Sequence, residues 1–253
     1  MKAVVCIKTA TGGAVDASDA FDRAGRVGAA VLNACDARAV EAALRIVEQA
    51  GQGEVVVVAL APAEMLGAVR EALALGANRA LMLSDPLLFG ADLLATSQAL
   101  AALLAREKAD IYLTCPWSGD VDGTLLWTAT GERLGLPALT QARQLQIQAR
   151  RVIIQCQTES GDQVLETDLP CMVEVTETIH RPRYATLKGK AAARSKPVQL
   201  LKLADLALEP PRSGTQVLAT RERPPRRTPV VLQDSGEAPA RILEFLRGKG
   251  MVP

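Results

Sequence analysis

The segment CPWSGDVDGTLLW, residues 115–127, contains the residues of this chain best suited to hold an anion. It combines glycine, serine and threonine with two aspartates, Asp120 and Asp122. The apolar, β-branched run at residues 109–115 predicts a buried strand before it. Residues 123–134 have the length of a helix and are followed by a glycine and a proline that end helices. The segment therefore joins a strand to a helix N-terminus, where free backbone N–H groups and the helix dipole favour a phosphate.

Three roles are open to this segment. A phosphate cradle would use the backbone donors of residues 123–126, with Asp122 as the helix N-cap. A catalytic carboxylate pair would need a second titrating group held nearby, and the sequence fixes none, so Asp120 is better suited to a hydrogen bond with a ribose or a loop amide. A plain capped turn is the structural alternative. We expect the cradle, and we expect no catalytic side chain.

Length and hydropathy narrow the class of protein. A chain of 253 residues, 49% of them hydrophobic, can form one large or two small domains. It contains no run near the ~20 apolar residues that a membrane span requires. The N-terminus turns polar after about seven residues, unlike a secretory signal. These features predict a soluble, cytoplasmic protein without membrane insertion.

The cysteines predict buried thiols rather than a disulfide framework or a metal site. They are odd in number, they form no CxxC pair, and each has apolar or small neighbours. Such thiols are typical of a reducing cytosol. The five are Cys6, Cys35, Cys115, Cys156 and Cys171.

Charge divides the chain near residue 180. Residues 1–180 carry 14 basic and 22 acidic side chains, whereas residues 181–253 carry 15 and 6. Residues 181–202 alone hold seven basic groups and no acidic one. Such a segment favours an anionic partner, which could be nucleic acid, an acidic protein face or the acidic body of the same chain. Because only Tyr184 is available there to stack on a base, we do not expect nucleic acid.

Alternating strand and helix signals predict a parallel α/β sheet. Valine-rich or apolar runs predict the strands, and apolar residues at helical spacing predict the helices between them. Repeated βαβ units require parallel strands with helices on both faces, because the crossovers are right-handed. The expected strands are residues 2–8, 54–61 and 79–83, and the expected helices are residues 36–51, 64–76 and 92–107.

The pattern changes after Pro137. Residues 145–179 alternate with period two around a Ser-Gly-Asp turn, which predicts antiparallel strands added to the sheet. From His180 onward prolines are frequent and helical signal is sparse before residues 237–250, so this part is disordered or wraps another surface. We therefore expect a nucleotide-binding domain at residues 1–180 and an extended arm at residues 181–253.

The segment HRPRYATLKGKAAARSKPVQ, residues 180–199, resembles the small (beta) subunit of electron transfer flavoproteins, whose corresponding segment reads NEPRYATLPNIMKAKKK. Further matches lie at DARAVEAALRI, ALALGANRALML, GERLGLP and LETDLPCMVEVTETI. The likeness covers nearly the whole chain, and PRYATL is its most specific motif.

This resemblance implies a Rossmann-like domain that belongs to a heterodimer. In the family, a larger alpha subunit carries the redox FAD, and the pair collects electrons from acyl-CoA or related flavin-dependent dehydrogenases. The beta subunit holds a structural AMP, or a second FAD in bifurcating members, and its C-terminal arm lies across the alpha subunit. The chain would then be an electron carrier rather than an enzyme, because the flavin does the chemistry.

The resemblance also assigns residues to the nucleotide and to the partner. The nucleotide contacts of the family lie at the ends of two strands, in the turn before a helix and in the acidic loop. The leucine of YATL anchors the loop that recognises the dehydrogenase, and basic neighbours would steer it toward an acidic face. The predicted cofactor-binding residues are Cys6, Asn33, Ala34, Cys35, Leu60, Thr114, Cys115, Asp120, Asp122, Gly123, Thr124, Leu125 and Leu126. The predicted partner-binding residues are Arg183, Tyr184, Leu187, Lys188 and Lys190.

Three alternatives stay open. A bifurcating-type subunit would bind its own FAD in this chain. The stretch SGDVDGT is also similar to the SGGxDS loop of ATP-pyrophosphatases, which would make the chain an adenylating enzyme, although in those enzymes the loop follows the first strand and here it follows a late one. A stand-alone adenine-nucleotide-binding protein would account for the body of the chain but would leave residues 181–202 unexplained.

Overall fold

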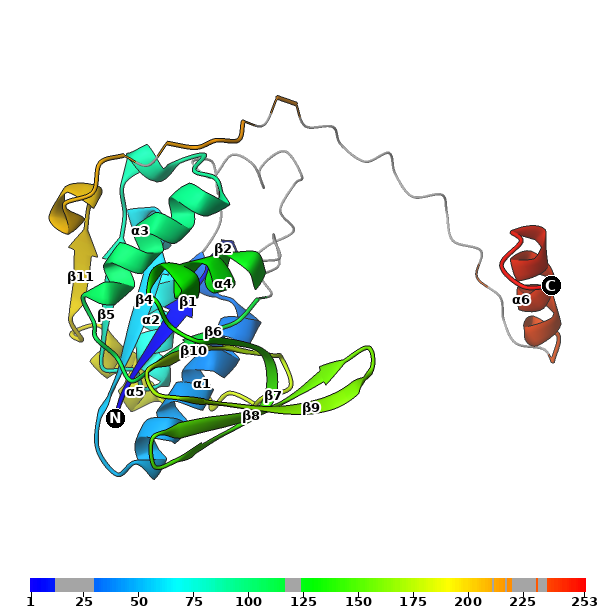
Figure 1. Ribbon diagram of the computed structural model, residues 1–253, viewed down its shortest axis with the longest axis horizontal. Helices are drawn as coiled ribbons and strands as arrows, with labels where there is room; N and C mark the ends of the chain where they lie inside the picture. The colour runs from blue at the N-terminus through cyan, green and yellow to red at the C-terminus, as the bar shows by residue number, and fades with distance from the viewer. Residues whose placement is uncertain (12–29, 117–123, 211, 217, 220–230, 232–235) are drawn as a thin grey trace. The chain divides into compact units, whose positions relative to one another are not determined.

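The computed structural model describes residues 1–11, 30–116, 124–210, 212–216, 218–219, 231 and 236–253. The chain forms two compact units, Met1–Thr220 and Arg221–Pro253. The first unit holds a nine-stranded, mostly parallel sheet with helices on both faces (Figure 1). This confirms the predicted Rossmann-like α/β class. No helix in the described ranges is long and apolar enough to cross a membrane.

β1 (Lys2–Ile7) lies at the centre of the sheet. It pairs in parallel with β4 (Glu54–Leu60) on one side and with β6 (Ile111–Thr114) on the other. The full order is β11-β5-β4-β1-β6-β10-β7-β8-β9, so the direction of winding reverses between β1 and β6. In open α/β sheets, ligands bind outside the carboxyl ends of the strands at such a switch point. The other parallel strands are β5 (Arg79–Leu83), β10 (Cys171–Val175), β7 (Ala138–Gln148) and β11 (Val198–Leu201).

Helices cover both faces of the central strands, which explains their uninterrupted apolar sequences. Val55 to Val58 of β4 are at most 1% exposed. One face packs against α1 (Ala34–Gln49), α2 (Leu66–Leu75) and α5 (Leu187–Ala193), and the other against α3 (Leu93–Ala105) and α4 (Thr124–Arg133). The four helices predicted before residue 137 are therefore confirmed to within a few residues at each end.

The last three strands in the sheet order form an antiparallel extension. β8 (Arg151–Thr158) pairs with β7, and β9 (Gly161–Asp168) pairs with β8 through the predicted turn. The prediction was wrong for the end of this stretch, because β10 runs parallel to both β6 and β7. All five residues of β10 are buried, as expected for a strand inside the sheet, and period-two alternation alone does not give strand direction.

Part of the basic segment folds onto the first unit. β11 adds a strand beside β5, while Ala193, Leu201 and Leu203 are buried. This strand was not expected, because it is only four residues long and follows a stretch rich in basic residues. The functional division at residue 180 stays a prediction. The remaining short elements are β2 (Thr9–Thr11), β3 (Ala30–Leu32), η1 (Ala63–Met65), η2 (Pro86–Leu88) and η3 (Leu203–Leu206).

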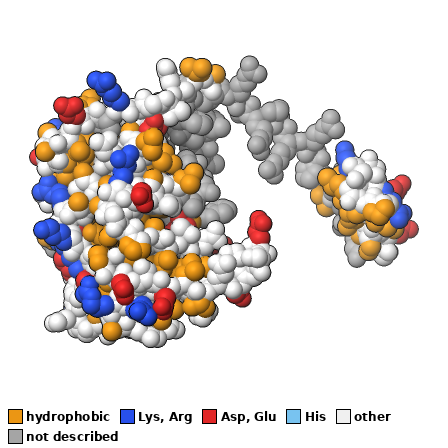
Figure 2. Space-filling view, in the orientation of Figure 1, with side chains coloured by type: hydrophobic (Ala, Val, Ile, Leu, Met, Phe, Trp, Pro, Cys, Tyr) orange, Lys and Arg blue, Asp and Glu red, His pale blue; other side chains and the backbone are white. Residues whose placement is uncertain are grey.

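The second unit contains α6 (Ala238–Gly248), and none of its residues is buried. Large apolar side chains gather on this helix (Figure 2). Ile242, Leu243 and Phe245 are 50%, 41% and 63% exposed. The helix therefore presents apolar surface that its own unit does not cover.

Four charged side chains close the amino-terminal edge of the sheet, opposite the switch point. Glu107 is the most buried of them, with 5% of its side chain exposed, and it lies 2.6 Å from Nη2 of Arg79 and 2.7 Å from Nζ of Lys2. Glu54 completes the group through Arg79 and Lys2. Burial raises the pKa of Glu107, but hydrogen bonds from Arg79 and Lys2 outweigh it and hold the pKa below its ordinary value.

We expect Glu107→Gln to lower the free energy of unfolding by about 1–3 kcal/mol at neutral pH, because it removes the partner of two partly buried cations. The folded-state pKa of Glu107 is depressed below 4.5, so its stabilisation is present above that pH and is lost as the pH falls through the folded value. The difference between parent and variant in urea unfolding should therefore be larger at pH 7 than at a pH below 4.5. An equal difference at both pH values would show that the carboxylate charge is not the cause.

Candidate functional site

A pocket opens at the carboxyl ends of β1, β4 and β5, on the face that α3 and α4 cover. Its cavity is about 110 Å³, smaller than the roughly 300–1,000 Å³ of most ligand sites, so it suits one ring system rather than a whole cofactor. Its walls are mainly apolar, with three polar side chains among them. The apolar walls include Ile7, Leu60, Leu83, Leu100, Leu126 and Trp127, and the polar ones are Lys8, Asp85 and Thr96.

Trp127 forms one wall of this pocket and is held in place by a hydrogen bond. Its indole Nε1 donates to the carbonyl oxygen of Cys115 at 3.2 Å, and the side chain is 6% exposed. Leu126, the preceding residue of α4, also lines the pocket. The start of α4 is therefore fixed against the end of β6 at the switch point.

A second hydrogen bond fixes the start of α1 against the end of β1. The backbone N–H of Lys8 donates to Oδ2 of Asp36 at 2.7 Å. Asp36 is fully buried in the first turn of α1, where the helix dipole favours a carboxylate. Asn33 caps the same helix by accepting from the N–H of Cys35 at 3.3 Å. The predicted nucleotide residues Asn33 and Cys35 thus belong to one rigid helix start.

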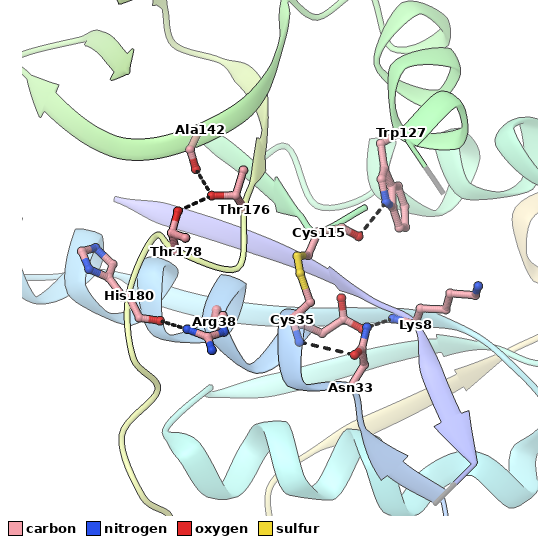
Figure 3. The surroundings of a disulfide bond; sticks show 11 residues. Lys8, Asn33, Cys35, Arg38, Cys115, Trp127, Ala142, Thr176, Thr178 and His180 are labelled. Atoms are coloured by element: carbon pink, nitrogen blue, oxygen red, sulfur yellow. Dashed lines mark hydrogen bonds between the residues drawn. A yellow bond between two sulfur atoms is a disulfide. The ribbon is translucent and has the colours of Figure 1, made fainter. Parts of the chain in front are cut away.

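Cys35 and Cys115 are joined by a disulfide bond (Figure 3). Their Cα atoms are 5.9 Å apart although 80 residues separate them in the sequence. The prediction of free thiols was therefore wrong for this pair. The fold brings the start of α1 and the end of β6 together beside β1, and spacing along the chain does not reveal that encounter.

The other three cysteines are buried free thiols, as predicted. Burial raises the pKa of Cys171 to about 12. Burial, with a smaller contribution from the carboxylate of Asp36, raises the pKa of Cys6 far above its usual range. Since the thiolate is the reactive form, these two thiols are inert.

The predicted nucleotide residues lie on both faces of the switch point. Cys6 belongs to the core beneath α3 and α4, whereas Cys35 and Cys115 belong to the core beneath α1. Thr114 is fully buried at the end of β6, and strand alternation places it on the same face as Tyr112, which lies beneath α3 and α4. Its Oγ1 has no hydrogen-bond partner among the described residues, and Thr114 does not line the pocket.

The other predicted residues differ in how far they are described. Leu60 and Leu126 line the pocket, Ala34 is exposed at the start of α1, and Leu125 is 72% exposed. The cradle and its N-cap stay predictions. Asp120, Asp122 and Gly123 lie outside the described residues, as does the side chain of Thr124, the first residue of α4.

The polar side chains of the pocket were not singled out from the sequence. Lys8 follows β1 and Asp85 follows β5, so their places after strands were a usable signal. Thr96 lies within α3 and gave no such signal. Asp85 is already engaged, because its carboxylate accepts from the N–H groups of Leu87 and Leu203. In the described part of the chain, no group of His, Cys, Asp or Glu side chains is arranged to hold a metal.

The PRYATL motif forms a loop that leads into α5. Leu187 and Tyr184 are 87% and 83% exposed. Arg183 has the opposite role, because its guanidinium lies 2.7 Å from a carboxylate oxygen of Glu41 and 2.6 Å from one of Glu48. The loop is therefore anchored on α1 through Arg183 and presents its two large apolar side chains to solvent.

One basic side chain of residues 181–202 is bound within the first unit. Nζ of Lys196 donates to the carbonyl oxygens of Leu73 and Ala77 at the end of α2, at 2.9 and 2.6 Å. Lys188 and Lys190 remain exposed near Leu187, and Lys190 borders a groove of about 760 Å³ beside the motif. Tyr184 also lines this groove. An apolar tip with a basic rim is thus left for another surface.

Comparison with known proteins agrees with this arrangement. The family described as "Electron transfer flavoprotein domain" matches residues 25–206. A Mycobacterium tuberculosis protein named electron transfer flavoprotein subunit beta is 33% identical over 227 residues, which are 86% of this chain and 85% of that protein. Subunit CarD of the caffeyl-CoA reductase-Etf complex of Acetobacterium woodii is 33% identical over 191 residues, 75% of this chain and 73% of its own length. The beta subunit of Megasphaera elsdenii is 29% identical over 209 residues, with 78% and 77% covered.

The family match includes the PRYATL motif and every residue that lines the switch-point pocket except Ile7 and Lys8. The matches also agree with the motif that the sequence itself displays at residues 182–187. The chain therefore belongs to the electron transfer flavoprotein family, in the group of its beta subunits.

Proposed function

We propose that this chain is the beta subunit of a heterodimeric electron transfer flavoprotein that works in the cytoplasm. With an alpha subunit that holds most of the FAD, it passes electrons on from a flavin-dependent dehydrogenase of the acyl-CoA or a related type. The observation that carries this proposal is Leu187, a leucine 87% exposed at the first position of α5, directly after a loop that Arg183 anchors on α1. A large apolar side chain held out in this way acts as a small docking anchor.

The exposed lysines beside Leu187 favour a partner with an acidic face. Among the described residues, Lys188 and Lys190 form no ion pair with a carboxylate, whereas Arg183 is held by Glu41 and Glu48. Rim charges of this kind speed encounter with an acidic face more than they tighten the complex. The small anchor and the charged rim together suit a contact that must release quickly.

The pocket at the switch point is proposed to hold AMP as a structural nucleotide. Its apolar walls, including Leu60 and Trp127, suit an adenine ring, and its volume suits the base alone. Lys8 lines the pocket, and Thr114 is buried on the same side of the sheet with a hydroxyl that lacks a partner among the described residues. The residues present would therefore fit the adenine base, and the backbone N–H groups at the start of α4 would be suited to its phosphate.

The role of this chain in the reaction is to bind and position. FAD supplies the redox chemistry when it is bound. Residues of this chain dock the dehydrogenase through the PRYATL loop and keep the nucleotide pocket closed to water with Trp127. The uncovered apolar side chains of α6 are proposed to pack on the alpha subunit, because none of that helix is buried in its own unit. We assign no acid–base or nucleophilic step to any side chain.

We expect heat-released extract of the purified chain to contain AMP, identified by its mass. FAD in the extract would support the bifurcating alternative instead. Thr114→Val should weaken AMP binding about 2- to 12-fold, the value of one hydrogen bond, while thermal stability stays equal or rises because a buried hydroxyl without a partner is removed.

The matched control for this variant is Thr130→Val. Thr130 is fully buried too, but its Oγ1 already donates to the carbonyl oxygen of Leu126 at 2.7 Å. The control should therefore lose stability. If Thr114→Val melts lower and binds AMP as the parent does, its hydroxyl serves the fold and the pocket assignment is wrong.

We expect Leu187→Ala to weaken docking of the dehydrogenase by about 1–3 kcal/mol, the value of burying such a side chain. The melting temperature and nucleotide content should stay at the parent values because Leu187 is exposed in the free chain. Electron transfer from the dehydrogenase, measured against its concentration, gives the affinity. Leu200→Ala, at a leucine 53% exposed on β11, is the control. Equal losses in the two variants would argue against a specific anchor.

A further inference from the structure

We propose that the disulfide between Cys35 and Cys115 is a reversible redox switch on the switch-point pocket, and that its reduced, dithiol form is the form that accepts the nucleotide. The second half of this inference rests on the proposed nucleotide function. The first half concerns a redox-active pair of side chains in the protein itself, separate from any flavin.

The disulfide lies close enough to the pocket for its reduction to affect the pocket walls. Cys115 accepts the indole hydrogen bond of Trp127, a wall residue, through its own carbonyl oxygen (Figure 3). On the other side, Cys35 is followed by Asp36, whose carboxylate accepts from the N–H of Lys8, a second wall residue. Trp127 is thus hydrogen-bonded to Cys115 itself, and Lys8 is hydrogen-bonded to the residue that follows Cys35.

The bond also restrains the two elements that frame the switch point. It fixes the first turn of α1 to the end of β6, at a Cα–Cα distance of 5.9 Å. Unbonded sulfur atoms cannot approach as closely as bonded ones, so reduction must turn the side chains or move α1 away from β6. Either change loosens the start of α1. The nucleotide contacts that the family resemblance predicts, including Asn33 and Cys35, lie there. The oxidised form is therefore the closed form.

The chemistry is thiol–disulfide exchange with a dithiol reductant. One thiolate of the reductant attacks a sulfur atom of the pair and forms a mixed disulfide, and its second thiol then displaces the other cysteine. The protein gains two electrons and two protons as two thiols, and the reductant leaves as its own disulfide. Cys35 is 5% exposed, and its neighbour Ala34 is exposed at the end of a helix, where local opening is easiest.

The remaining cysteines make the response specific to this pair. Cys6, Cys156 and Cys171 are free and buried. Burial raises the pKa values of Cys6 and Cys171, which suppresses their thiolates. Because binding and reduction share one equilibrium, a nucleotide that prefers the dithiol form must favour reduction by the same factor.

The test uses the full chain in an oxidised form and in a form reduced with dithiothreitol. Alkylation after denaturation, read by mass, should label three cysteines in the first and five in the second. Calorimetry should show AMP binding about tenfold tighter to the reduced chain, within the usual range for coupled sites. Cys35→Ser should make AMP binding independent of the reductant, and Cys156→Ala, the control, should still respond to it.

A second readout does not depend on nucleotide. Trp117→Phe leaves Trp127 as the one tryptophan, and its emission should rise on reduction because a nearby disulfide quenches indole fluorescence. Equal AMP affinity in both forms, or labelling of five cysteines without reductant, would overturn the switch. AMP binding to neither form, with the Trp127 response intact, would reject the nucleotide assignment and uphold a redox-responsive pocket. An unchanged Trp127 signal would reject the coupling to the pocket.

Discussion

The parallel pairing of β1 with both β4 and β6 is the interaction on which the rest of the structure depends. It makes β1 a central strand, buried on both faces, and it places the reversal of strand order next to its carboxyl end. The starts of α1 and α4 are then brought to one edge, where Asp36 holds Lys8 and Cys115 holds Trp127. The pocket, the disulfide and the predicted nucleotide residues all follow from that single arrangement.

Different interactions dominate at the two edges of the sheet. At the amino-terminal edge, Glu107 is satisfied by Arg79 and Lys2, so charge there stabilises the scaffold. At the carboxyl edge, the pocket walls are mainly apolar, and the buried hydroxyl of Thr114 lacks a partner among the described residues, which lowers stability. The PRYATL motif shows the same contrast. Arg183 forms ion pairs within the first unit, whereas Leu187 remains exposed.

Much of this fold could be predicted from the sequence because β1 and β4 are continuous apolar runs and the helices between strands have a clear period. Three features could not. The direction of β10 depends on which strands it lies between, and a period of two is the same in either direction. β11 is stabilised by pairing with β5 rather than by its own composition. The disulfide joins the first turn of α1 to the end of β6, 80 residues apart, so cysteine spacing gave the wrong expectation for Cys35 and Cys115. Among the site residues, Leu60 and Leu126 were found through the family motif, whereas Thr96 faces the pocket from a helix and carried no signal.

We propose that this chain carries electrons only as part of a flavin-bearing heterodimer. The most direct measurement is the bleaching of flavin absorbance after rapid mixing with a reduced dehydrogenase, for the alpha subunit alone, for this chain alone and for the two together. We expect fast, saturable bleaching in the mixture of both subunits and slow bleaching with the alpha subunit alone. This chain alone should give no redox-active flavin signal. Equally fast bleaching of the alpha subunit without this chain would contradict it.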